Sequence, residues 1–212
     1  MDGIALVRKA DYRKRSLHNW LVIPREAEGG FTVGDISISV CGGKVPPFKK
    51  GTTPLVLLTA AGIRPVEVRV SDVEIDGMDA TEKIVGAIVS SKWKIEVLLS
   101  RSVPVAGFNL IDPEEILKTT GVPSVFVLEE EPDSVAVEMA LRKHFPDWRR
   151  RLEVLSRPLG PQRFETPGTG GVFLACYGIS PELAFRTMRR LSVFGKIPEP
   201  LRVCCMLSKA IS

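Results

Sequence analysis

The stretch RPVEVRVSDVEIDGMDATEKIVGAI, residues 64–88, decides the fold because its apolar period changes part-way along. Residues 66–70 alternate valine with charged side chains, which is typical of a half-buried strand. Further on, apolar residues recur at helical spacing, with Asp79 as the expected N-cap and Glu82 at the third helical position. A strand followed closely by an amphipathic helix predicts an α/β fold.

Further strands and helices are expected on both sides of this stretch. The first three strands have short connections, which predicts an antiparallel meander. The expected strands cover residues 36–40, 55–60, 66–70, 96–99, 123–128 and 172–177, and the expected helices begin at 79, 112, 133, 180 and 200. The order βββ-α-β-α-β-α predicts a mixed sheet with helices on both faces, an order shared by the ribonuclease H-like fold.

Length and composition predict one globular domain. The 212 residues are 44% hydrophobic, enough to bury a substantial core. Residues 1–34 form a poorly patterned lead-in, and residues 35–212 form the expected domain. No apolar run approaches the roughly 18 residues needed to cross a bilayer, and the basic start lacks an apolar signal segment. We therefore expect a cytoplasmic protein without a membrane partner.

The cysteines and the charge balance give weaker indications about metal sites, disulfides and binding partners. Cys41, Cys176, Cys204 and Cys205 form no CxxC pair, and the chain has two histidines, which argues against structural zinc. Apolar surroundings favour buried reduced thiols, while a disulfide stays open for a hyperthermophilic source. The formal net charge of +4 slightly favours a polyanionic partner. We expect no cofactor.

Five segments carry a more specific signal. They are EIDGMDATEK (74–83), AGFN and the following Asp112 (106–112), HFPD (144–147), GISPE (178–182) and GKIPEPLR (195–202). In this order they resemble domain-of-unknown-function family 99, a largely archaeal family grouped with endonuclease V in the ribonuclease H-like superfamily. The resemblance runs from about residue 33 to the C-terminus and implies the ribonuclease H-like fold.

The resemblance also implies where a nuclease would carry its acids. Such a fold hydrolyses phosphodiesters with carboxylates that hold two Mg²⁺ ions at the ends of central strands. We would expect one Asp at the end of the first strand and another at the end of the strand after the first helix. Here those strands end in Cys41 with two glycines, and in Ser100 with Arg101. Neither pair offers a carboxylate, and an inward-pointing Arg101 would repel cations.

Five side chains near strand ends and a helix start are expected to line one cleft, namely Cys41, Asp76, Asp79, Ser100 and Asn109. Asp76 and Asp79 are weak candidates for holding a metal ion. The favoured interpretation makes Asp79 a helix cap and Asp76 part of a turn. The Asn109 amide either contacts a base or sugar or closes a loop. Cys41 has no histidine predicted beside it, so a buried thiol is preferred to a nucleophile.

The run Trp148-Arg149-Arg150-Arg151 is the strongest indication of nucleic-acid binding. Arginine can pair with phosphate, and an adjacent aromatic ring can stack on a base. The competing interpretation is a solvated charged face, because acidic residues flank the run.

Three hypotheses follow from these patterns. The first is a non-catalytic endonuclease V-like domain that binds nucleic acid or a protein partner. The second is a nuclease that uses Asp76, Asp79 and another acid such as Asp112, with Mg²⁺ or Mn²⁺, in an altered geometry. The third is a structural subunit that dimerises as a homo-oligomer. Convergence of the three carboxylates would favour the second hypothesis, whereas likeness of fold alone does not transfer activity.

Overall fold

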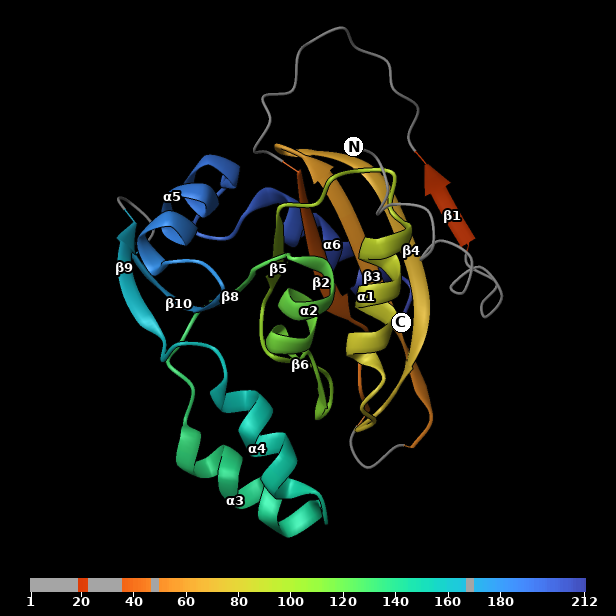
Figure 1. Ribbon diagram of the computed structural model, residues 1–212, viewed down its shortest axis with the longest axis vertical. Coiled ribbons are helices and arrows are strands. Elements are labelled where there is room, and N and C mark those ends of the chain that lie inside the picture. Colours follow the sequence, from red (N-terminus) through yellow and green to blue (C-terminus); the bar gives the residue numbers. More distant parts are fainter. Residues whose placement is uncertain (1–18, 23–35, 47–49, 167–169) are drawn as a thin grey trace, which may run out of the picture.

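A mixed sheet of eight strands forms the centre of the computed structural model, which describes residues 19–22, 36–46, 50–166 and 170–212. Its strand order is β1-β4-β3-β2-β5-β8-β10-β9, and β6 and β7 form a separate two-stranded hairpin (Figure 1). The strands are β1 (Asn19–Val22), β2 (Ile36–Gly42), β3 (Thr52–Ala61), β4 (Arg64–Glu74), β5 (Val97–Ser100), β6 (Pro104–Ala106), β7 (Asn109–Leu110), β8 (Ser124–Leu128), β9 (Gln162–Thr166) and β10 (Gly170–Tyr177).

Helices cover both faces of this sheet (Figure 1). They are α1 (Ala80–Ser90), α2 (Pro113–Thr120), α3 (Ser134–His144), α4 (Trp148–Ser156), α5 (Pro181–Leu191) and α6 (Glu199–Ala210). Among the described residues, no helix is long and apolar enough to cross a membrane.

The centre of the sheet confirms the predicted order of elements. Strands β2, β3 and β4 form the antiparallel meander, and β5 then lies parallel to β2 on its other side. Strand β8 continues the parallel part, so that Val40, Ser100 and Phe126 lie side by side across three strands. This is the arrangement of the ribonuclease H-like fold, in which β2 is the edge of the meander that pairs with the parallel strand β5.

Alternation along each strand divides the core into two layers. Val40 and Leu98 face α1, α2 and the β6–β7 hairpin. Their neighbours Cys41 and Leu99 face α5 and α6 on the opposite side. Because successive side chains of a strand point to opposite faces, each position near the end of β2 or β5 can be assigned to one layer.

The helix ends show why these segments are helical. Asp112 accepts hydrogen bonds from the amides of Glu114 and Glu115 at the start of α2, and Gly121 ends that helix with a φ of 73°. Ser180 accepts a 3.3 Å bond from the Leu183 amide at the start of α5. Such side-chain caps satisfy amides that a helix leaves unpaired, and both were expected from the sequence.

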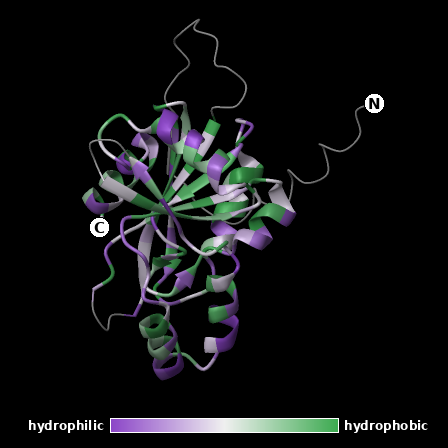
Figure 2. Cartoon of the chain, turned by 90° about the vertical axis from the view of Figure 1, so that its left-hand side faces the viewer, coloured by the Kyte–Doolittle hydropathy of each residue, from purple (hydrophilic) through white to green (hydrophobic). Residues whose placement is uncertain are grey.

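Four features were not predicted. Strand β1 adds an edge strand from within residues 1–34, and the rest of that lead-in lies outside the described residues. Strand β9 adds the opposite edge. The short β6–β7 hairpin and helix α4 complete the set. Helices α3 and α4 pack together as a hairpin, the α3–α4 hairpin, which projects from one end of the molecule (Figures 1 and 2).

Candidate functional site

The ends of β2 and β5, where the fold would carry its acids, are closed by backbone. Val40 pairs with Ser100, so Gly42 and Ser100 both belong to the layer that faces α1. A Cβ at Gly42 would overlap the carbonyl oxygen of Val105 in β6, which lies directly over this position. Ser100 is buried, and its hydroxyl donates a 2.9 Å bond to the carbonyl of Ser102.

Cys41 lies on the other face of the sheet and is bonded to Cys205 of α6. The expectation of reduced thiols is therefore wrong for Cys41 and Cys205, while Cys176 and Cys204 are free and buried as predicted. Cys41 does not join Ser100, because the two side chains belong to opposite layers. Placing aspartates at both positions would put one carboxylate on each face of the sheet.

Arg101 does not enter the space between the strand ends. Its guanidinium forms an ion pair with Glu129, and its side chain is 36% exposed. The cation expected to oppose metal binding is thus directed to the surface. The ends of β2 and β5 thus carry neither a carboxylate nor an inward-facing arginine.

Asp76 joins the loop after β4 to the β6–β7 hairpin. It adopts a left-handed φ of 61°, which is uncommon for a residue with a side chain. Its amide donates a 2.9 Å bond to the Ala106 carbonyl. Its Oδ1 accepts a 2.8 Å bond from the Phe108 amide. These bonds stabilise the unusual conformation, and they occupy the carboxylate oxygen Oδ1.

Asp79 occupies the N-cap position of α1, but its side chain makes no capping hydrogen bond, which corrects the sequence interpretation. Its Oδ1 accepts a 2.6 Å bond from Asn109 Nδ2 and a 3.2 Å bond from the Glu74 amide. Asn109 supplies the cap from a distant segment, because its Oδ1 accepts a 3.1 Å bond from the Ala80 amide. Asn109 is fully buried, so its amide closes the loop and is not presented to a base or sugar.

Arg151 is a structural residue that sequence reasoning assigned to the wrong role. It is only 5% exposed, although it stands in a run of basic residues. Its guanidinium donates to the carbonyls of Asp76, Gly77 and Phe108 at 3.0, 3.1 and 2.6 Å. It also pairs with Asp147 at 3.0 Å and lies 4.4 Å from the centre of the Phe145 ring. Arg151 therefore ties α4 to two other motif segments and is removed from the candidate nucleic-acid contacts.

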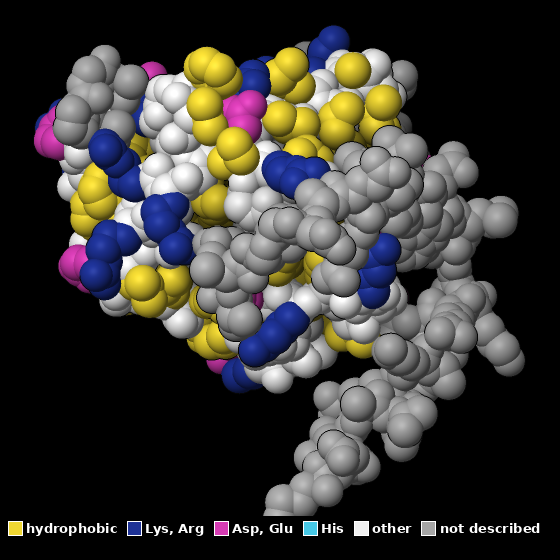
Figure 3. Space-filling model, turned by 90° about the horizontal axis from the view of Figure 1, so that it is seen from above, with side chains coloured by type: hydrophobic (Ala, Val, Ile, Leu, Met, Phe, Trp, Pro, Cys, Tyr) yellow, Lys and Arg dark blue, Asp and Glu magenta, His cyan; other side chains and the backbone are white. Residues whose placement is uncertain are grey.

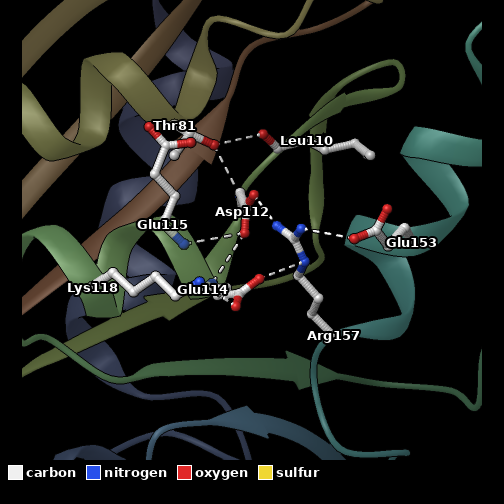
Figure 4. Close-up of polar contacts among 8 residues, drawn as sticks. All are labelled: Thr81, Leu110, Asp112, Glu114, Glu115, Lys118, Glu153 and Arg157. Carbon is white, nitrogen blue, oxygen red and sulfur yellow. Dashed lines mark hydrogen bonds and ion pairs between the residues drawn. The ribbon is translucent and has the colours of Figure 1, made fainter.

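Asp112 is held by a second inward-pointing arginine of this region (Figure 4). Arg157 forms an ion pair with Asp112 and reaches Glu114 and Glu153 at 3.1 Å each. The hydrogen bond that Arg157 donates to Asp112 is the largest cause of the raised pKa of Arg157. The other oxygen of Asp112 caps α2. Asp112 thus fastens the start of α2 to the end of α4.

These donors do not fit the two-metal site that the fold implies. A metal site would require the carboxylates of Asp76, Asp79 and Asp112 to converge on one ion. Instead, each carboxylate binds a different partner. In the described ranges, no three His, Cys, Asp or Glu side chains are arranged to hold a metal ion. Asp76, Asp79 and Asn109 do gather at one end of the sheet, where they brace loops against one another.

The outward face of α4 carries the remaining basic residues. Arg149 and Arg150 are exposed, and within the described part of the chain neither forms an ion pair with a carboxylate. The Trp148 ring lies between two guanidiniums, those of Arg142 and Arg149, at 4.5 and 4.6 Å from its centre. Arg142 also pairs with Glu138. The contact with this ring restrains Arg149, whose side chain remains exposed.

Comparison with known proteins places the chain in a family. The model of the endonuclease dU family matches residues 46–212. A UPF0215 protein of Thermococcus gammatolerans is 42% identical over 163 residues, which are 76% of this chain and 82% of the relative. A Pyrococcus furiosus UPF0215 protein is 36% identical over 141 residues, covering 66% and 71%. This chain belongs to the endonuclease dU family. Its relatives named here come from archaea, as the resemblance implied.

Solved structures confirm the fold of this endonuclease dU family member. A protein of unknown function from Archaeoglobus fulgidus superposes with a TM-score of 0.73 at 21% identity, over 83% of this chain and 97% of that one. Human endonuclease V gives 0.54 at 16% identity, covering 88% and 90%. Endonuclease V of Ciona intestinalis, solved with an inosine-containing DNA, gives 0.52 at 9% identity, covering 88% and 89%. The fold is therefore endonuclease V-like.

Proposed function

We propose that this chain is a non-catalytic member of the endonuclease dU family that binds nucleic acid through Arg149 and Arg150. The observation that carries the proposal is the division of one basic run into two roles. Arg151 is buried and structural, whereas Arg149 and Arg150 face solvent on the projecting α3–α4 hairpin.

The strand ends support the non-catalytic part of the proposal. Metal-dependent phosphodiester hydrolysis needs carboxylates that share an ion. The Ser100 hydroxyl donates a hydrogen bond to the Ser102 carbonyl, and the Val105 carbonyl lies over Gly42. A carboxylate at position 42 would first have to displace the β6 backbone. We expect no metal-supported cleavage from this arrangement.

The chemistry of the α4 face supports nucleic acid as the ligand. A guanidinium is planar and always charged, and it pairs well with phosphate oxygens. Stacking on Trp148 restricts the rotamers of Arg149, so less side-chain entropy is lost when phosphate binds. The DNA complex of the Ciona intestinalis endonuclease V shows that a protein of this fold binds DNA. Its binding mode is not transferred to this chain.

Fluorescence anisotropy with labelled single- and double-stranded DNA and RNA of one length tests the proposal. The affinity should fall steeply as salt rises, because phosphate contacts release counterions. The double substitution Arg149→Ala with Arg150→Ala should weaken binding on every sequence. It should also lower the magnitude of the slope of log K against log salt by about 2. Its melting temperature should match that of the wild type.

The matched control removes two exposed arginines of α5, Arg186→Ala with Arg189→Ala. Figure 3 looks onto the end of the molecule that carries α5, away from the α3–α4 hairpin, and basic side chains are visible there among apolar ones. This control has the same net charge as the test variant and should retain wild-type binding. Absence of binding at low salt, or equal loss in both variants, would remove the proposal.

A further inference from the structure

Helix α3 presents an exposed apolar face. Val135 and Met139 lie one helical turn apart, and they are 67% and 66% exposed. Leu141 is the one buried residue of α3, and the helix packs on α4 with its other side. Within the ranges that the structure describes, no other element covers Val135 and Met139. Two exposed apolar side chains on one helix face are candidates for contact with another protein surface.

The charges at the two ends of this face have opposite signs. Glu130 and Glu131 lie just before the helix and are exposed. Arg142 and Lys143 lie in its last turn and are also exposed. Glu138 lies within the helix and forms an ion pair with Arg142, so Lys143 is the basic residue that remains at the end of α3, and the surface reads acidic, apolar and basic in chain order. A complementary partner must place basic groups opposite the acidic end of α3, apolar groups opposite Val135 and Met139, and acidic groups opposite the basic end.

A second copy of α3 running antiparallel has this order. We propose that the chain forms a twofold homodimer through α3, with the axis passing midway between Val135 and Met139. Residues at equal distances on either side of the axis then meet. Val135 packs on the partner's Met139, and Glu131 faces the partner's Lys143. Because a twofold interface is isologous, each contact occurs twice.

The dimer is expected to be weak. Stable interfaces bury about 800 Å² on each partner, and one helix face offers less. Val135 and Met139 would supply the apolar contact, while two pairs of exposed charges would set the direction and register. The proposal does not depend on nucleic-acid binding, since Arg149 and Arg150 lie outside the contact.

Sedimentation equilibrium over a wide range of protein concentration tests the dimer. The wild type should shift reversibly from monomer to dimer, and Met139→Glu should remain monomeric with an unchanged melting temperature. The control is Phe194→Glu, which alters a side chain that is 71% exposed and lies between α5 and α6. It should dimerise like the wild type. A wild type that stays monomeric at several hundred micromolar would overturn the proposal.

Charge exchange gives a second test that misfolding cannot imitate. Lys143→Glu places two acids opposite each other, and Glu131→Lys places two bases opposite each other. Each variant alone should dimerise roughly ten-fold more weakly than the wild type. Mixed in equal amounts, they should form a heterodimer about as strong as the wild-type dimer, because both charge pairs are attractive again. A mixture no stronger than its components would show that α3 does not pair in this register.

Discussion

Arg151 of α4 donates a 3.0 Å hydrogen bond to the main-chain carbonyl of Asp76, 75 residues earlier in the chain. The same guanidinium reaches Phe108 of the β6–β7 hairpin. Asp76 in turn binds the Phe108 amide through its carboxylate. Two segments that suggested a cleft, residues 74–83 and 106–112, are thus joined to α4 by one buried cation and to each other by one carboxylate.

The first prediction concerns the two roles within the basic run. Arg151→Ala should lower the free energy of unfolding by about 3 kcal/mol or more, because it leaves three carbonyl groups without their donor. Arg149→Ala, two residues away and exposed, should change it by less than about 0.5 kcal/mol. Urea unfolding followed by circular dichroism measures both. Equal effects would mean that Arg151 does not join the motifs.

The second prediction concerns pH. The hydrogen bond from Arg151 lowers the pKa of Asp147 below its ordinary value. A lowered carboxyl pKa favours the folded state above the unfolded pKa near 4, and this advantage is lost as pH falls through the folded pKa. Asp147→Asn should therefore be less stable than the wild type at pH 7. Because Asp147 is partly exposed, the difference should be small, and it should shrink between pH 5 and pH 2. If the melting temperatures of the wild type and Asp147→Asn differ by the same amount at every pH in this range, the hydrogen bond between Arg151 and Asp147 does not stabilise the fold as stated.

The third prediction separates backbone strain from the contact with Asp76. Gly107 and Gly121 both have left-handed φ values, 63° and 73°. Gly121 has open space around it, whereas a Cβ at Gly107 would overlap Asp76 Oδ1. Gly121→Ala should cost about 1 kcal/mol of stability from strain alone. Gly107→Ala should cost roughly 3 kcal/mol, because the carboxylate must also leave the Phe108 amide. Chemical unfolding of the two variants measures both costs. An equal loss of stability in Gly107→Ala and Gly121→Ala would argue against the contact between Gly107 and Asp76.

The fourth prediction concerns the bond between Cys41 and Cys205, which joins residues 164 positions apart. Unfolded without reductant, the chain should expose two thiols, and after reduction it should expose four. Burial raises the pKa of Cys176 to about 12, so this thiol should react slowly in the folded protein. Cys205→Ser should lower stability by about 2–5 kcal/mol. Four reactive thiols in the unreduced, unfolded chain would disprove the bond.

Periodicity predicted most of the fold, because the central strands and capped helices have local signals. Strands β2 to β5 and the starts of α2 and α5 lie where the apolar pattern and capping residues indicated. Helix α4 was missed because its inward face carries Arg151, a charged residue that apolar patterns assign to the surface. The sequence patterns also missed the edge strands β1 and β9 and the β6–β7 hairpin. Each of these strands has five residues or fewer.

The sequence brought together Asp76, Asp79 and Asn109, which the structure also joins, but it misplaced Cys41 and misread the roles of several residues. Asp79 was expected to cap α1, yet Asn109 provides that cap from 29 residues further along the chain. Cys41 and Ser100 lie near the ends of the neighbouring strands β2 and β5, but alternation places them in opposite layers of the core. Such partners are set by tertiary packing, and a single sequence carries no local signal for them. The missing carboxylates, by contrast, could be read directly from the strand ends.

The proposal that this endonuclease dU family member is not a metal-dependent nuclease can be tested directly. The most direct measurement incubates the purified wild type with Mg²⁺ or Mn²⁺ and labelled DNA or RNA, both ordinary and deaminated. The strand ends predict no cleavage above a protein-free control, because Ser100 and Gly42 provide no carboxylate for an ion. Reproducible cleavage that requires the ion, and that is abolished in a folded Asp79→Asn variant, would contradict the account.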